Sequence, residues 1–258
     1  MEVAYQILTY RATRNLGDAV QTVAMSRLLA GPLFGVYRDQ ADRARPDIPF
    51  VVNGWLGGPV PAAHPDCTFA GVFVGARRAE QLTWLRSSGR SVGARDPHTL
   101  SLLSVAGTHA EMVGCATLTF DRYGGRRSGR YAVDAGGSER GCIELTMGLP
   151  VGCPWHEQWA LAVARLETLR TAELVVTTRL HVALPCLAYG TPVIVRRTRI
   201  GLSEQPERLT LLDALAIPAD EAAVVDVTPW AARYLRWLGE RVEVRCRPGG
   251  PRCPQSPD

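Results

Sequence analysis

The chain has 258 residues, a net charge of +4 and 46% hydrophobic residues, which is typical of a soluble globular protein with one large domain or two smaller ones. All 29 basic residues are arginine, which excludes a P-loop lysine, a Schiff-base lysine and a lysine general base. The seven cysteines are scattered without a CxxC pair, and they fit neither a zinc site nor a disulfide framework.

The ends and the charges of the chain give few signs of targeting. No basic region followed by a long apolar stretch opens the sequence, and no apolar run approaches the ~20 residues of a membrane span. We therefore expect a cytoplasmic protein without a membrane span. The arginine clusters are short and lack interleaved aromatic residues, so we expect no nucleic-acid partner. Arginine forks bind carboxylate and phosphate, so acidic small molecules fit this composition.

The first predicted strand, at 3–9, leads into a helix predicted over 18–29 by its apolar periodicity. Asn15, Gly17 and Asp18 lie in the turn between them. Gly17 allows close approach of a ligand, and the first N–H groups of the helix are expected to be unpaired and able to hold an anion or a sugar hydroxyl. The alternative is that Asp18 only caps the helix.

Two further strand ends in the first half carry polar residues. Strands are predicted at 49–53, 69–74, 91–94 and 111–113, with helices at 77–86 and 97–106. Asn53 ends the first of these strands, and the glycine-rich loop after it does not match a dinucleotide fingerprint. Arg95 follows the third, with Asp96 as the predicted N-cap of the next helix. Both are candidate binding residues; the alternative for Arg95 is a surface pair with Asp96 of little energetic weight.

After an Arg- and Gly-rich linker at 121–129, the pattern of strands and helices resumes. Strands are predicted at 131–134 and 142–147, and the strongest helical periodicity covers 155–170. Weaker patterns near the C-terminus predict a helix at 206–215, a strand at 222–227 and a helix at 230–238.

The most informative stretch is 172–195, which reads as strand, polar tip, helix and strand, with Gly190 at the helix C-cap. Arg179 and His181 stand at the polar tip, where open α/β sheets bind ligands. If the chain is still extended there, these two side chains point together and Leu180 turns to the core. A solvated arginine and a structural histidine are the alternative, but the position at the strand end favours a site for an acidic substrate that exchanges a proton.

Alternating strands and helices on both sides of the linker predict an α/β fold with two doubly wound Rossmann-like domains facing each other across a cleft. The predicted boundaries are 1–124 and 125–247, with a disordered tail at 248–258. Substrate is expected in the cleft, with Asn15, Asn53 and Arg95 on one side and the Arg179–His181 pair on the other.

Three motifs together resemble the polysaccharide pyruvyl transferase family: NLGDA at 15–19, ARDPHTLSLL at 94–103 and AELVVTTRLHVALPCLAYGTPVI at 172–194. A weaker likeness covers 201–215. The resemblance implies a fold similar to two-domain glycosyltransferases of the B type. It implies transfer of a pyruvyl group from phosphoenolpyruvate to a sugar as a ketal, with release of phosphate.

By the same resemblance, Arg95 and Arg179 bind phosphoenolpyruvate and His181 is the general acid, whereas Asn15, Gly17 and Asn53 contribute to substrate binding. Asp18 is the candidate base on an acceptor hydroxyl. Phosphoenolpyruvate is then a co-substrate, with no cofactor and no metal, and the acceptor is a carbohydrate or glycoside. The chain is short for this family, and no second catalytic histidine is placed among His64, His98, His109 and His156.

Two other functions remain open on this scaffold: a glycosyltransferase that uses a nucleotide sugar, and a binding protein that has lost the chemistry. The first predicts nucleotide binding near 190–199 and no affinity for phosphoenolpyruvate. The identity of the acceptor and the ketal stereochemistry are not given by the sequence, and neither is the oligomeric state, for which a homodimer is allowed.

Overall fold

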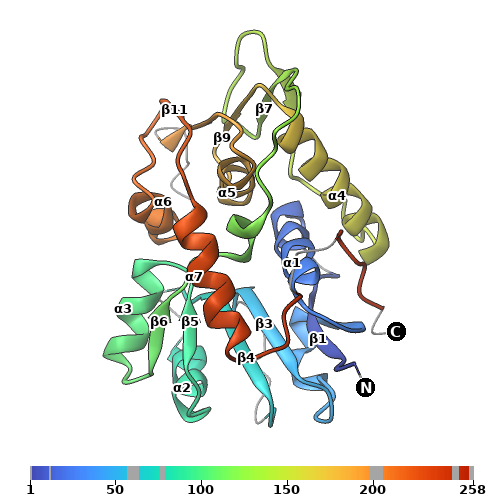
Figure 1. Cartoon of the computed structure of the whole chain (residues 1–258), viewed down its shortest axis with the longest axis vertical. Helices are drawn as coiled ribbons and strands as arrows, with labels where there is room; N and C mark the ends of the chain where they lie inside the picture. The colour runs from blue at the N-terminus through green and yellow to red at the C-terminus, as the bar shows by residue number, and fades with distance from the viewer. Residues whose placement is uncertain are drawn as a thin grey trace.

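The computed structural model describes residues 2–11, 13–56, 64–75, 79–197, 206–245 and 250–255. Its strands form two sheets, one in each half of the chain (Figure 1). The first sheet has the order β2-β1-β3-β4-β5-β6 with every neighbouring pair parallel, and the second has the order β11-β10-β9-β7-β8, in which only β11 is antiparallel among the described strands. Two mostly parallel α/β sheets are the arrangement that the alternating pattern predicts.

The strands of the first sheet are β1 (Tyr5–Thr9), β2 (Leu33–Tyr37), β3 (Phe50–Trp55), β4 (Cys67–Phe73), β5 (Val92–Ala94) and β6 (Ala110–Met112). Its connections hold α1 (Leu16–Leu28), α2 (Ala79–Ser87), α3 (Pro97–Val105) and the 3₁₀ helices η1 (Arg38–Arg43) and η2 (Ala116–Thr119). The second half holds β7 (Arg130–Val133), β8 (Ile143–Leu145), α4 (Trp155–Thr171), β9 (Leu174–Thr177), α5 (Leu180–Tyr189), β10 (Val193–Val195), η4 (Pro206–Leu209), α6 (Thr210–Ala214), β11 (Ala222–Ala223) and α7 (Thr228–Gly239).

Several element ends follow from local chemistry, as predicted. The side chain of Asp96 accepts a hydrogen bond from the Thr99 N–H at 2.9 Å, and Pro97 occupies the first turn of α3. Gly190 ends α5 with φ +69°, a left-handed conformation that favours glycine. The predicted strand at 222–227 is wrong beyond Ala223, because only two residues pair with β10.

The strand β2 is absent from the predicted elements, and its environment explains why. Its pairing is entirely long-range, with β1 on one side and with Gln255 on the other. Gly35 donates its N–H to the Gln255 carbonyl at 2.8 Å, and a Cβ at Gly35 would lie 2.8 Å from Thr9 Cγ2. The predicted disordered tail at 248–258 is therefore wrong for residues 250–255, which cover the edge of β2.

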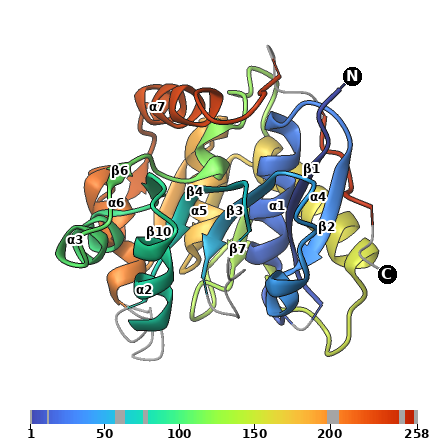
Figure 2. The same ribbon diagram turned by 90° about the horizontal axis from the view of Figure 1, so that it is seen from below.

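The chain also crosses back to the first half through α7, which lies across the first sheet with α2 on the opposite side (Figures 1 and 2). The Tyr234 hydroxyl of α7 donates to the Ala70 carbonyl in β4 at 3.1 Å. Gly71, with φ +69°, lets Tyr234 come close, because a Cβ there would lie 3.0 Å from the tyrosine ring. The predicted boundary at residue 247 groups α7 with the second half, whereas its packing is with the first.

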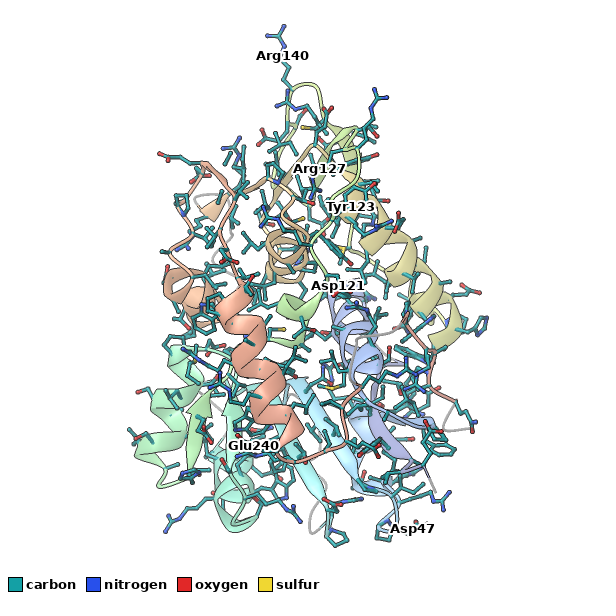
Figure 3. The ribbon with its side chains drawn as sticks, in the orientation of Figure 1. Asp47, Asp121, Tyr123, Arg127, Arg140 and Glu240 are labelled. Carbon is teal, nitrogen blue, oxygen red and sulfur yellow. The ribbon has the colours of Figure 1, made fainter. Side chains whose placement is uncertain are left out.

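The linker between the halves is held by Arg127, which Figure 3 places with Tyr123 above Asp121. Its guanidinium donates to the carbonyls of Arg170 and Tyr189, both at 2.7 Å, at the ends of α4 and α5. Burial lowers the pKa of this arginine. One continuous hydrophobic core then joins the two halves, with residues of α1 packed among residues of α5. The halves are thus in close contact, and an open cleft between them is not confirmed.

Candidate functional site

The two halves meet where the turn from β1 to α1 faces the segment after β8. Asn15 caps α1 by accepting a hydrogen bond from the Gly17 N–H at 3.1 Å. The Leu16 N–H donates to the Met147 carbonyl at 2.8 Å, and the Leu149 N–H donates to the Arg14 carbonyl at 2.9 Å. These bonds join the two halves like a short pair of strands.

The same bonds correct an expectation about α1. Its first N–H groups were expected to be unpaired, but Leu16 and Gly17 have the acceptors just described, and the Asp18 N–H donates to the Asn15 carbonyl at 3.1 Å. The cap of the helix is Asn15 and not Asp18. The N-terminus of α1 therefore contributes shape to the site, because its donors are already used.

The second turn, from β9 to α5, carries the predicted Arg179 and His181. Arg179 is the N-cap of α5 with an extended backbone, and its N–H donates to the Thr177 hydroxyl at 2.9 Å. His181 is only 5% exposed and has non-helical φ and ψ of −81° and 17°. Leu180 is half-buried: it packs against the hydrophobic core, as predicted, and also lines the same hollow as its two neighbours.

Asp134 holds this turn in place, and sequence reasoning missed it. Its Oδ2 accepts from Arg179 Nε and from the Met147 N–H, each at 3.0 Å, and its carbonyl accepts from the Thr178 hydroxyl at 2.6 Å. Its backbone has φ +45°, an uncommon conformation that aspartate tolerates better than most residues. The signal that could have found it is its position directly after the strand ending at Val133.

The two turns enclose one small hollow. Asn15 and Gly17 come from the first half, and Met147, Arg179, Leu180, His181 and Leu209 come from the second. Its volume is about 20 Å³, which is room for about one water molecule. A Cβ at Gly17 would lie 3.2 Å from the Cβ of His181, so the absent side chain is what allows the two turns to touch. The structure thus brings together four of the predicted residues: Asn15, Gly17, Arg179 and His181.

The remaining predicted residues lie at the carboxyl edge of the first sheet and do not line the hollow. Asp18 is buried, accepts from the Thr13 hydroxyl at 2.7 Å and pairs with Arg38 at 3.5 Å. The Arg38 guanidinium stacks over the rings of Tyr10 and Trp55. With these partners Asp18 orients Arg38, and its assignment as a base stays a prediction.

Asn53 is buried beside α1, where its amide donates to the Gln21 carbonyl at 3.2 Å. Its side-chain oxygen makes no hydrogen bond within the described part of the chain. Gly54 follows with φ +81°, and a Cβ there would lie 2.6 Å from Gln21 Oε1. The backbone of β3 therefore turns at this glycine to fit against α1.

Arg95 has the most unusual environment of the predicted residues at this edge. Its side chain is fully buried, its Nε donates to Asp96 at 3.0 Å, and its guanidinium carbon lies 4.3 Å from the centre of the Phe73 ring. Within the described residues, Nη1 and Nη2 have no hydrogen-bond partner. The predicted pair with Asp96 exists, but it is in the interior and not on the surface. A buried guanidinium with two unused nitrogens is costly unless an anion comes to it.

The described residues form neither a metal site nor a membrane span. No group of three or more histidine, cysteine, aspartate or glutamate side chains is arranged to hold a metal ion. Nor does any described helix combine the length and apolar character needed to cross a bilayer. Of the cysteines that the structure describes, four are buried, Cys142 is half-buried and Cys253 is exposed.

Comparison with known proteins shows the family to which the chain belongs. The model of the family described as "Polysaccharide pyruvyl transferase" matches residues 67–198, which is half of the chain and spans both Arg95 and the Arg179–His181 turn. The chain belongs to the polysaccharide pyruvyl transferase family. A transferase role follows from this membership.

One solved structure supports the fold alone. An uncharacterised protein from Klebsiella pneumoniae is 12% identical, with a TM-score of 0.53 over 82% of this chain and 89% of that one. A UDP-GlcNAc 2-epimerase from Methanocaldococcus jannaschii is 10% identical over 92% of this chain and 99% of that one, with a TM-score of 0.40. Among curated proteins no match was found.

Proposed function

We propose that the protein transfers the pyruvyl group of phosphoenolpyruvate to two hydroxyl groups of a carbohydrate, forming a ketal and releasing phosphate. The observation that carries the proposal is that Arg179 and His181 meet the Asn15–Gly17 turn in one hollow between the halves. A fixed cation and an imidazole are the groups that an anionic substrate undergoing proton transfer requires.

The donor is anionic at both ends, and the two arginines match it. Arg179 is anchored through Nε by Asp134, and its side chain lines the hollow. Arg95 has two buried nitrogens, Nη1 and Nη2, without a hydrogen-bond partner among the described residues at the carboxyl edge of the first sheet. We assign one arginine to the carboxylate and the other to the phosphate, because bidentate pairs with such anions are the strong ones.

The reaction balances with the groups that the site offers. His181 gives a proton to the methylene carbon, which becomes a methyl group, and the central carbon then accepts one acceptor hydroxyl oxygen. The bond from that carbon to the phosphate oxygen breaks, and the second hydroxyl oxygen closes the ketal. Of the two hydroxyl protons released, one restores His181 and the other leaves with phosphate.

The hollow is far smaller than the donor. Ligand sites for small molecules usually measure ~300–1,000 Å³, whereas this one measures about 20 Å³. Donor binding therefore requires α1 and α5 to move apart, and the contacts that must loosen include the Leu16–Met147 and Leu149–Arg14 hydrogen bonds. Closure afterwards removes water from the site, which strengthens each charge contact.

The test is thermal unfolding with and without phosphoenolpyruvate. A ligand that binds only the folded state stabilises it by about 2.7 kcal/mol at a hundredfold excess over Kd. We expect a stabilisation that Arg179→Ala abolishes. Arg170→Ala is the matched control, because it removes an exposed guanidinium of α4 that is paired with Glu167 away from the hollow.

A nucleotide-sugar panel run in parallel decides between the transferases. No response to phosphoenolpyruvate together with stabilisation by a nucleotide sugar would overturn the proposal in favour of glycosyl transfer. Stabilisation by phosphoenolpyruvate that persists in Arg179→Ala would place the donor elsewhere.

A further inference from the structure

A second and larger depression lies next to the hollow, at the carboxyl ends of β1 and β2. It measures about 420 Å³, and its lining includes Arg11, Tyr37, Trp155, His156 and Cys253. We refer to it as the side groove. It combines the end of the first sheet with the start of α4 from the second half, so it lies between the two halves as the hollow does.

The few residues that connect the two linings limit the distance between the side groove and the hollow. Asn15 lines the hollow and Arg11 lines the side groove, and four residues of extended chain span at most about 14 Å. On the other side, Met147 lines the hollow and Gly152 lines the side groove. A ligand only two or three sugar rings long is therefore enough to reach from one to the other.

The walls of the side groove are aromatic. Tyr37 ends β2, whereas Trp155 and His156 begin α4, so rings from both halves face the same space. Such side chains offer a flat apolar face together with a polar edge, which suits a ligand whose ring faces are apolar and whose rim carries hydroxyl groups.

The polar groups of the side groove are mainly donors. The Trp155 indole N–H is buried against the sulfur of Cys253, which is only a weak hydrogen-bond acceptor. The N-cap of α4 is Pro154, which has no side chain to accept from the first N–H groups of the helix. A buried indole N–H that faces a weak acceptor, and a helix start without a side-chain cap, favour a ligand rich in oxygen.

The charge of the side groove favours a neutral ligand over a phosphate. Arg11 is already paired with Asp39 at 3.0 Å, and its guanidinium lies over the Tyr37 ring at 5.6 Å. Glu157 in the first turn of α4 does not line the side groove, but its carboxylate lies behind the lining residue Cys153. Hydroxyl and acetal oxygens accept hydrogen bonds without adding charge.

The C-terminal segment supplies one wall. Cys253 and Pro254 line the side groove, and the segment is fixed by Gln255 on β2 and by Arg252, whose guanidinium donates to the Gly31 carbonyl at 2.6 Å. Residues that the sequence assigns to a disordered tail are thus part of a pocket.

We propose that the side groove binds a neutral saccharide and presents its terminal ring to the hollow, which makes it the acceptor site of the transferase. This inference rests on the proposed function for its chemical meaning, but binding itself is measured without the donor. The residues that decide acceptor choice are Tyr37, Trp155 and His156, together with the C-terminal segment.

The first experiment measures saccharide binding in the absence of phosphoenolpyruvate. Saturation-transfer NMR with methyl hexopyranosides, lactose and cellobiose is expected to detect binding to the wild-type chain. Trp155→Phe keeps a ring and removes the N–H, and we expect about tenfold weaker binding. His156→Ala removes an exposed ring and is expected to weaken binding several-fold. The control is His109→Ala, which removes an exposed ring directly before β6 and is expected to leave binding unchanged.

A second measurement uses Cys253 as a reporter, because it is the exposed thiol among the described cysteines. Burial raises the pKa of this thiol, so alkylation is run near pH 9, where more thiolate is present. Bound saccharide is expected to slow labelling of Cys253 severalfold, with Cys142 as the internal control. Peptide mass spectrometry assigns the label to each cysteine.

The outcomes separate the two proposals. Saccharide binding that is lost in Trp155→Phe, without any response to phosphoenolpyruvate, supports the side groove and overturns the pyruvyl donor. Stabilisation by phosphoenolpyruvate with no saccharide binding, or with binding that neither Trp155→Phe nor His156→Ala weakens, overturns the side groove and leaves the donor site intact.

Discussion

Arg95 and Arg179 occupy the same kind of position in the two halves of the molecule and have opposite environments. Each follows a parallel strand, and each donates its Nε to an aspartate at 3.0 Å. Arg95 is fully buried, with two nitrogens that have no hydrogen-bond partner among the described residues, whereas the side chain of Arg179 is 38% exposed at the hollow. The first half therefore keeps its arginine in the interior of the protein, and the second half has its arginine partly exposed to solvent at the hollow.

The difference has an energetic meaning. A half-exposed arginine beside an aspartate costs the folded state little free energy, because water solvates the part of the guanidinium that the aspartate does not contact. A buried arginine with unused donors destabilises the folded chain, and such strain usually persists where function needs it. Changing each arginine separately therefore tests whether the two act on one ligand.

The largest effect is expected from Arg179→Ala. Loss of the cation at the hollow should lower kcat/KM for the donor by about a thousandfold, as when a charge-stabilising group is removed from an active site. Because the side chain is partly exposed, the free energy of unfolding should change little. Steady-state kinetics and a denaturant melt check both parts. An equally large loss of stability would mean that Arg179 is structural.

The buried partner is tested by the double change Arg95→Met with Asp96→Ser. It removes both charges of the interior pair while serine still caps α3. Replacing a buried ion pair by apolar contacts is often stabilising by about 1–4 kcal/mol, so we expect a ligand-free protein at least as stable as the wild type. Donor kcat/KM should fall about a hundredfold. Unchanged donor kinetics would remove Arg95 from the site.

Asp134→Asn should have a smaller effect. Asparagine adopts the left-handed backbone at this position as readily as aspartate, but it binds Arg179 without a charge. We expect kcat to fall about tenfold and the donor KM to rise. Asp134→Ala should add backbone strain, so that its melting temperature drops below that of the asparagine variant. Equal kinetics in wild type and Asp134→Asn would show that Arg179 needs no anchor.

The smallest effect is expected from Gly17→Ala. Alanine favours a helix over glycine by about 1 kcal/mol, yet its Cβ would press on His181 at 3.2 Å. We expect kcat to fall several-fold without loss of thermal stability. The pH dependence of kcat should keep its shape, because the proton donor is displaced and not replaced. A fully active variant would show that the two turns need not touch during catalysis.

Whether a feature of the fold or the site could be predicted depends on how far apart in the sequence its contacting residues lie. Asp96 and Pro97 at the start of α3, and Gly190 at the end of α5, were predictable because their hydrogen bonds are made within a few residues. The Arg179–His181 turn was found because an apolar strand ends there. By contrast, β2 and residues 250–255 define each other across more than 200 residues, so neither has a local signature.

The sequence pattern also could not predict that Arg95 lies in the interior. The sequence places it beside Asp96 at a strand end, which fits a surface pair equally well, and only the packing of Phe73 and its neighbours buries it. Asp134 has its local signal, the end of β7, but its left-handed backbone and its bond to Met147 depend on the folded loop.

The return of the chain to the first sheet has a consequence for synthesis. The β2 edge and the face of β4 remain uncovered until α7 and residues 250–255 have left the ribosome, because those segments follow the second half in the chain. The first half therefore waits with an open sheet edge while the whole second half is translated, a state that is prone to wrong pairing. Slowing translation over 125–220 should then lower the yield of native protein, and supplying the C-terminal segment in trans should restore part of it.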